Sequence, residues 1–120
     1  MRVYRIGDSE TKGRSGYSAS YVADLTLRSP MDSVGVIEVK IPKRTKTEPH
    51  AHAVLEEAFI IMNRTRMGVG STLLELEAGD VVLASPGELH WFETYDDEDV
   101  TLIALKMPNL KNDKVTQISN

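Results

Sequence analysis

The segment EPHAHAVLEEAFII, residues 48–61, places two histidines just ahead of a pair of glutamates and an apolar run. The chain has only three histidines, and two of them, His50 and His52, stand two residues apart here. In an extended segment, side chains at positions i and i+2 point to the same face. We therefore expect the two imidazoles to lie side by side. Neutral imidazole is a good ligand for first-row divalent metals, so this pair predicts two corners of a metal site.

The third histidine lies in GDVVLASPGELHWFET, residues 79–94. Gly79-Asp80 is typical of a turn that opens a strand, and Pro86-Gly87 of a tight turn that closes it. His90 then begins the next strand, whose inward side can meet the inward side of the strand with the first two histidines in a barrel. Phe92 shares the face of His90 and is a candidate lining residue or a core aromatic.

A carboxylate can complete this set, and the sequence offers two neighbours, Glu56 and Glu57. Strand alternation groups Glu57 with Phe59 and Ile61, and Glu56 with the residues between them. Both faces of this strand are apolar, so alternation alone does not choose between the glutamates. It does predict a strand covered on both sides, by the barrel interior and by a second sheet or subunit.

Short strand-like runs separated by Gly, Pro and Asp fill most of the chain, which predicts an all-β sandwich or barrel. No stretch sustains the apolar period of a helix over three turns. We expect turns over 67–71 and in the acidic run 96–99, and a tail over 111–120 that is loose or forms a late edge strand. The expected strands cover residues 18–27, 34–41, 57–62, 72–78, 80–85, 89–95 and 99–107.

Composition narrows the class of protein. A chain of 120 residues suits one domain, residues 1–120. The net charge of -4 argues against a nucleic-acid partner. The absence of cysteine excludes disulfides and thiolate metal sites. The chain shows neither an apolar signal-peptide core nor the run of ~20 apolar residues that a membrane span needs, so we expect a cytoplasmic protein without a membrane partner.

The two histidine segments resemble the two motifs of a small single-domain cupin of the RmlC-like superfamily. The first motif has Gly, five residues, His-x-His, three or four residues, Glu, six residues and Gly. The second has Gly, five residues, Pro-x-Gly, two residues, His, three residues and Asn. His50, His52 and Glu56 or Glu57 fill the ligand positions of the first, and Gly79, Gly87 and His90 match the second.

Four positions depart from these motifs within residues 44–94. Arg44 and Arg64 stand at the two glycine positions of the first motif, Ser85 stands at the proline position of the second, and Thr94 replaces its asparagine. None of these is a ligand position. The resemblance implies a double-stranded β-helix, or jelly-roll barrel, and aligning Phe59-Ile60-Ile61 with the family's run after its metal glutamate favours Glu57 over Glu56.

The resemblance implies one divalent transition metal, Mn, Fe, Co, Ni, Cu or Zn, bound by His50, His52, Glu57 and His90, with one or two open coordination positions. We expect a metal-dependent enzyme acting on a small metabolite, of the dioxygenase or the isomerase or lyase type. The alternative is a non-catalytic module that binds a sugar or another small metabolite. A homodimer is also expected, because a small β-sandwich has exposed edges.

Overall fold

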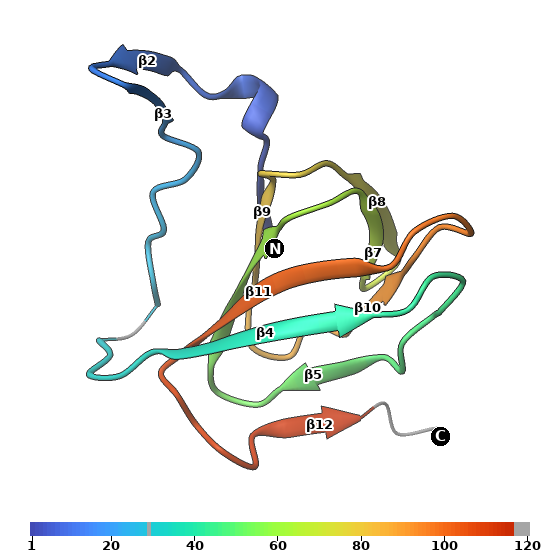
Figure 1. The fold of residues 1–120 in the computed structure, drawn as a ribbon. Helices are drawn as coiled ribbons and strands as arrows, with labels where there is room; N and C mark the ends of the chain where they lie inside the picture. Colours follow the sequence, from blue (N-terminus) through green and yellow to red (C-terminus); the bar gives the residue numbers. More distant parts are fainter. Residues whose placement is uncertain (29, 117–120) are drawn as a thin grey trace.

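Two five-stranded antiparallel sheets face each other in the computed structural model, which describes residues 1–28 and 30–116 (Figure 1). One sheet has the strand order β1-β9-β6-β11-β4, and the other has the order β12-β5-β10-β7-β8. The all-β prediction is therefore confirmed. One short 3-10 helix, η1, spans Ile6–Asp8, and no helix of the described part of the chain is long and apolar enough to cross a membrane.

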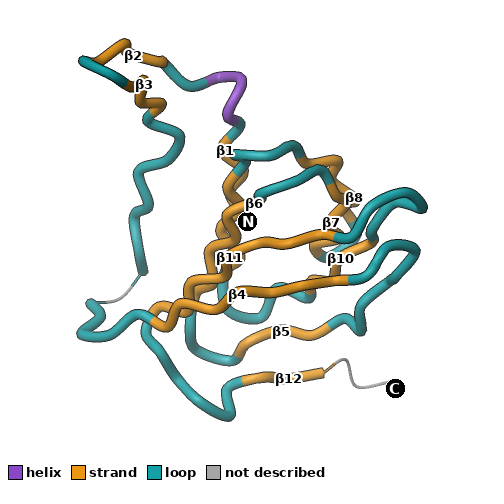
Figure 2. The backbone as a smooth tube through the Cα atoms, viewed as in Figure 1, coloured by secondary structure: helices purple, strands orange, loops and turns teal. Residues whose placement is uncertain are grey.

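The twelve strands of the described residues are β1 Arg2–Tyr4, β2 Thr11–Arg14, β3 Tyr17–Ser20, β4 Gly35–Ile41, β5 His50–His52, β6 Glu56–Ile61, β7 Thr65–Val69, β8 Thr72–Leu76, β9 Val81–Ala84, β10 His90–Glu93, β11 Val100–Met107 and β12 Lys114–Thr116. Strands β2 and β3 form a separate hairpin that extends away from the two sheets (Figure 2). The strands therefore divide into a barrel of two sheets and an N-terminal arm.

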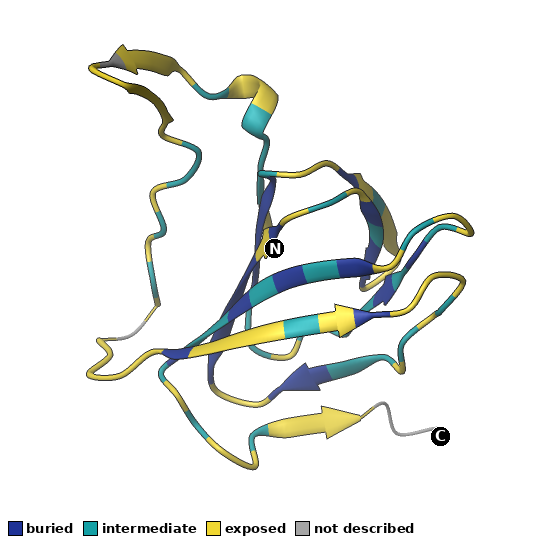
Figure 3. Ribbon diagram, viewed as in Figure 1, coloured by how far each residue is buried: buried dark blue, intermediate teal, exposed yellow. Residues whose placement is uncertain are grey.

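The core lies between the sheets, where every second residue of the long strands points inward. Strand β11 shows this alternation of buried and half-buried positions along most of its length (Figure 3). The inward residues are apolar and most of them are large, which gives the barrel one continuous interior. They are Ile41, Phe59, Ile61, Met67, Val69, Leu76, Val82, Ala84, Phe92, Val100, Leu102 and Ala104.

Six of the seven expected strands match observed strands to within two residues at each end, and the exception is the first. The expected strand over 18–27 is wrong: β3 ends at Ser20, and residues 21–27 form an extended loop. Leu25 and Leu27 of this loop pack against Ala58 and Leu83 on the outer face of the first sheet. The residues alternate as in a strand because the loop covers an apolar surface on one side.

The expected turn over 67–71 is also wrong in extent, because β7 continues to Val69 and only Gly70-Ser71 makes the turn to β8. Gly68 lies within the strand, directly opposite Trp91 of β10. A Cβ at this position would lie 2.1 Å from the Trp91 ring. This glycine therefore makes room for an aromatic ring and does not break the strand.

Part of the C-terminal tail forms the late edge strand that was one of its two expected forms. Residues 114–116 form the edge strand β12, which pairs antiparallel with β5. Lys114 lies opposite His52, and Thr116 lies opposite His50. Residues 117–120 of the expected tail lie outside the described residues. The tail thus covers the edge of the strand that carries two of the three histidines.

Three of the four glycine positions of the two motifs, all but that of Arg64, share a positive φ. Gly79 and Gly87 have φ values of 95° and 81°, in the left-handed region that favours glycine. Arg44, at the first glycine position of the first motif, has a φ of 54°. Its N–H donates to the carbonyl of Tyr95 at 2.9 Å, which holds the turn in place. The arginine therefore adopts a conformation that disfavours residues with a Cβ.

Replacing Arg44 with glycine is expected to raise the free energy of unfolding by about 0.5–1 kcal/mol, because glycine adopts a positive φ without the Cβ clash. Gly79→Ala is the opposite control, since its Cβ would add strain at a φ of 95° and lie 3.0 Å from Ile6. Urea denaturation of the three proteins gives the comparison. A destabilised Arg44→Gly variant would contradict this account of the turn.

Candidate metal centre

The three histidines lie on neighbouring strands of one sheet, and the glutamate lies on the other. In the β5–β10 pair, His50 and His90 are direct cross-strand partners, and their ring centroids are 4.5 Å apart. His52 lies two residues further along β5, with its ring 5.8 Å from that of His90. Glu57 reaches the same point from β6. The expectation that the two histidine segments meet inside a barrel is therefore confirmed.

The four side chains form one compact group. Each offers one ligand atom, and these atoms all lie within 4.8 Å of one another. Glu57, His52 and His90 are 5%, 4% and 1% exposed, whereas His50 is half-buried at the open side of the group. A group of three imidazoles and one carboxylate with a solvent-facing side suits a divalent metal that keeps a position for another ligand.

Hydrogen bonds to the backbone set the orientation of two imidazoles. His90 Nδ1 lies 3.0 Å from the carbonyl oxygen of Glu88, and His50 Nδ1 lies 3.4 Å from that of Glu48. A carbonyl oxygen only accepts, so Nδ1 is the donor and Nε2 keeps its lone pair in the neutral ring. Metal-binding histidines are commonly oriented by such a bond from the other ring nitrogen.

Two buried ring nitrogens in this group have no hydrogen-bond partner among the described residues, His52 Nδ1 and His90 Nε2, and the second supplies the test of fit for a metal. His90 Nε2 is buried and faces Glu57 Oε1 at 3.4 Å. A lone pair against a carboxylate oxygen is unfavourable unless a proton or a metal cation lies near both. The residues present therefore fit a bound cation by position and by chemistry.

The electrostatics of the group favour the forms that bind metal. Burial raises the pKa of Glu57, but its interactions with the imidazoles of His52 and His90 outweigh this and lower the pKa to about 2. The hydrogen bond from His52 Nε2 to Glu57 Oε1 is 2.9 Å long. Burial, and next the electrostatic influence of the neighbouring His90 imidazole, lower the pKa of His50 to about 4. Near neutral pH, Glu57 is therefore ionised and His50 is neutral.

The neighbouring glutamate points to a different environment. Glu56 is also buried, but its Oε1 accepts a hydrogen bond from the backbone N–H of Arg28 at 2.6 Å. It thereby fastens the loop that covers the outer face of the first sheet. The structure brings Glu57, and not Glu56, to the three imidazoles.

A cavity of about 270 Å³ opens over this group. His50, His52 and Glu57 lie on its polar side, and Phe92 and Phe59 are among its apolar walls. Phe92 thus takes the lining position that its parity with His90 indicated. The cavity also contains two lysines, Lys106 and Lys114, which the sequence did not single out. No local sequence pattern marks them, because the pairing of their strands with the strands of the candidate ligands places them there.

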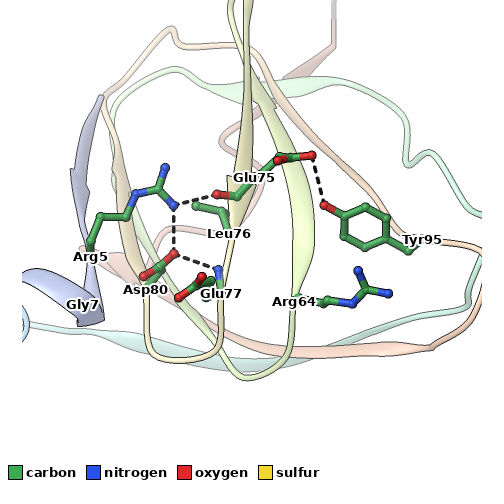
Figure 4. Close-up of a pocket in the computed structure, with 8 residues that line it drawn as sticks. All are labelled: Arg5, Gly7, Arg64, Glu75, Leu76, Glu77, Asp80 and Tyr95. Carbon is green, nitrogen blue, oxygen red and sulfur yellow. Dashed lines mark hydrogen bonds and ion pairs between the residues drawn. The ribbon is translucent and has the colours of Figure 1, made fainter.

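A second and larger hollow, of about 490 Å³, lies beside Arg5, Asp80 and Tyr95 (Figure 4). Its buried charged group, Asp80, is paired within the chain. Asp80 is 1% exposed, and it accepts from Arg5 at 2.9 Å, from the Ile6 N–H at 3.0 Å and from the Glu77 N–H at 2.8 Å. These contacts fasten the N-terminal strand to the β8–β9 turn. We therefore assign this hollow a structural role.

Two of the residues that depart from the motifs, Arg64 and Thr94, make contacts that hold nearby loops. Arg64, at the second glycine position, forms ion pairs with Asp97 at 2.9 Å and Glu98 at 3.0 Å. It thereby neutralises part of the negative charge of the acidic run 96–99. Thr94, at the asparagine position, is buried and donates to the carbonyl of Pro42 at 2.7 Å. It also accepts from the Thr45 N–H at 2.9 Å and so holds the loop that leads to β5. Neither contact reaches the candidate ligands.

No family model matches this chain. A gentisate 1,2-dioxygenase of Haloferax sp is 27% identical over 103 residues, which cover 86% of this chain and 27% of the relative. The chain thus spans about a quarter of the length of that curated protein. A cupin protein of Bacteroides fragilis superposes with a TM-score of 0.60 and 16% identity, over 82% of this chain and 98% of the other.

The DMSP lyase DddQ of Ruegeria pomeroyi DSS-3 superposes with a TM-score of 0.63 and 25% identity, over 71% of this chain and 43% of the lyase. Similarities at this level establish the architecture. The chain has the double-stranded β-helix fold of the cupins, and the resemblance seen in the two motifs is confirmed at the level of the fold. Its candidate metal centre consists of His50, His52, Glu57 and His90.

Exchanging each glutamate for glutamine tests which of them binds metal. In a Zn²⁺ titration, Glu57→Gln is expected to lower affinity at least about tenfold, because it removes the only negative charge of the group. Glu56→Gln is the matched control: its amide oxygen still accepts from the Arg28 N–H, so affinity should not change. Equal loss in both variants, or loss in Glu56→Gln alone, would refute the assignment.

The metal-free protein is expected to lose stability as the pH falls from about 6.5 towards 4. The pKa of His50 is about 4 in the folded chain and about 6.5 when unfolded, so the unfolded state binds more protons across this window. Glu57 contributes a further loss of stability only below pH 4.5, because its pKa falls from the ordinary value of 4.5 to about 2 in the folded chain.

Thermal melts of chelator-treated protein at pH 7 and pH 5 measure this effect. The difference in melting temperature should be smaller in His50→Gln than in the unaltered chain, because glutamine takes up no proton. All other titrating groups are the same in both proteins. An unchanged difference would show that His50 does not titrate as its burial predicts.

Proposed function

We propose that this chain is a metal-dependent enzyme that acts on a small metabolite, with one divalent transition metal held by His50, His52, Glu57 and His90. The observation that supports it most is the group of four ligand atoms within 4.8 Å of one another, beside a cavity of about 270 Å³. A site closed on all sides would be structural, whereas this one has an open side where a substrate can enter.

A bound metal of this kind supplies a Lewis acid or, when it is redox-active, a site for dioxygen chemistry. The chain's own residues do the remaining work. His50, which is half-buried, lies on the open side where a substrate can enter, and the apolar walls of Phe59 and Phe92 exclude water from around a bound substrate. The reaction proposed is of the dioxygenase or of the isomerase or lyase type. Gentisate 1,2-dioxygenase and DMSP lyase among the similar proteins are compatible with either.

The identity of the metal discriminates between these reaction types. Elemental analysis of the purified protein is expected to find one divalent transition metal per chain. Iron or copper would favour dioxygen chemistry, and manganese, cobalt, nickel or zinc would favour isomerisation or elimination. Adding the same metal to chelator-treated protein at pH 7.5 should raise its melting temperature, because metal binds the folded site in preference to the unfolded chain.

The variant His90→Gln tests whether the two histidine segments share one metal. It keeps the volume of the side chain and removes the imidazole, so the metal-induced rise in melting temperature should shrink strongly. Each protein is compared with its own metal-free form, which removes any effect of the substitution on the barrel. An undiminished rise in His90→Gln, or no rise with Mn, Fe, Co, Ni, Cu or Zn in the unaltered chain, would overturn the proposal.

We also propose that the protein is a homodimer that pairs through the outer face of the first sheet. Val36 and Ile60 lie on this face at 69% and 36% exposure, beyond the part that the loop over 21–27 covers. Light scattering at micromolar concentration is expected to give twice the mass of the chain. Ile60→Lys should reduce it to one chain, and Leu73→Lys on the outer face of the other sheet should not. A monomeric unaltered protein would refute the dimer.

A further inference from the structure

Two lysines stand beside the candidate ligands because of the register of the sheets. Lys106 of β11 lies directly opposite Glu57 of β6, and Lys114 of β12 lies directly opposite His52 of β5. Direct cross-strand partners point to the same face of a sheet, with Cβ atoms about 5 Å apart. Both lysines line the same cavity as the three ligands His50, His52 and Glu57. Each lysine therefore belongs to the wall of the cavity beside the candidate ligands.

Neither of these ammonium groups has a carboxylate partner among the described residues. The one lysine that forms an ion pair there is Lys40, with Glu38 at 3.6 Å on the outside of the barrel. The acid next to Lys114 in the chain, Asp113, is engaged elsewhere: its Oδ2 accepts from the N–H groups of Val54 and Leu55, both at 3.0 Å. Two cations thus line a partly apolar cavity without forming an ion pair there to any described residue. The one carboxylate among the described residues that line this cavity, Glu57, belongs to the candidate metal ligands. The two hydrogen bonds to Asp113, and less strongly the charge of Lys106, lower the pKa of Asp113, but it forms no ion pair with Lys106.

From this placement we infer that the cavity binds a small organic carboxylate, whose anionic group is held by Lys106 and Lys114 while its other end faces the metal centre. The inference rests on the proposed function, since it names the class of substrate for the same site. A divalent metal and Glu57 leave one positive charge, and the two lysines add two more. An anionic ligand reduces this positive charge, whereas a neutral one leaves it unchanged and a cationic one adds to it.

The other walls restrict the rest of the ligand. The cavity is lined by the apolar side chains Ile37, Val39, Ile41, Phe59 and Phe92. Its volume of about 270 Å³ corresponds to roughly nine water molecules at ~30 Å³ each, so it accepts a compact molecule. The structure therefore favours a small carboxylate with an apolar or aromatic body over a sugar, whose hydroxyl groups would find few hydrogen-bond partners here.

Benzoate and its neutral counterpart benzamide are suitable probes, because they share size and shape and differ in charge. Calorimetric titrations of Zn²⁺-loaded protein are expected to give at least about tenfold tighter binding of benzoate. Lys106→Gln and Lys114→Gln should each weaken benzoate by several-fold, and the double variant should remove most of its advantage over benzamide. Lys40→Gln, which removes the same charge from the outer surface, should leave benzoate binding unchanged.

A parallel Zn²⁺ titration of every variant separates this inference from the proposed function. If Zn²⁺ binds but benzoate affinity is the same in the double lysine variant, or if benzamide binds as tightly as benzoate, the carboxylate site is refuted and the metal centre stands. If benzoate binding depends on both lysines but no metal binds, the metal-dependent function is refuted and the carboxylate site stands. Reduced benzoate binding in Lys40→Gln equal to that of the cavity variants would also refute the site, since it would reflect net charge alone.

Discussion

A carboxylate buried between two sheets is the constraint on which the rest of this site depends. Glu57 is 5% exposed, and an ionised carboxylate is costly to bury without cationic or hydrogen-bonding partners. Its partners all come from the facing sheet, where His52 and His90 lie 2.9 and 3.4 Å from its Oε1. The two sheets are therefore joined at this end by polar groups, while the remainder of the barrel is joined by apolar contacts.

The register of the strands also fixes the positions of residues that are not candidate ligands. A shift of one residue in β6 would move Glu57 to the outer face and Glu56 to the interior. The same pairings place Lys106 beside Glu57 and Lys114 beside His52, so the cations of the cavity follow from the placement of the ligands. The candidate metal centre and the proposed anion site thus have a common origin in the pairing of four strands.

The two hollows of the molecule differ in how their charges are balanced. Around Asp80, the carboxylate has an arginine and two backbone N–H groups as partners, so the charges there are balanced within the chain. In the cavity of Glu57, the acid faces imidazoles, and the ammonium groups of Lys106 and Lys114 have no acidic partner among the described residues. The smaller cavity, and not the larger, is therefore the better candidate for ligand binding.

The sequence by itself determined the all-β class, most strand positions and the two segments that carry the histidines, because alternation and turn residues are local signals. It failed at 18–27 and 67–71, where a loop covers an apolar face and where Gly68 lies in a strand beneath Trp91. Both errors have the same cause. Neither an alternating pattern nor a glycine shows which part of the protein packs against that segment. Only the tertiary structure decided that Glu57 faces the imidazoles while Glu56 bonds the Arg28 backbone, and that Lys106 and Lys114 enter the cavity. Both depend on pairing between strands distant in the chain, which no local pattern of residues encodes.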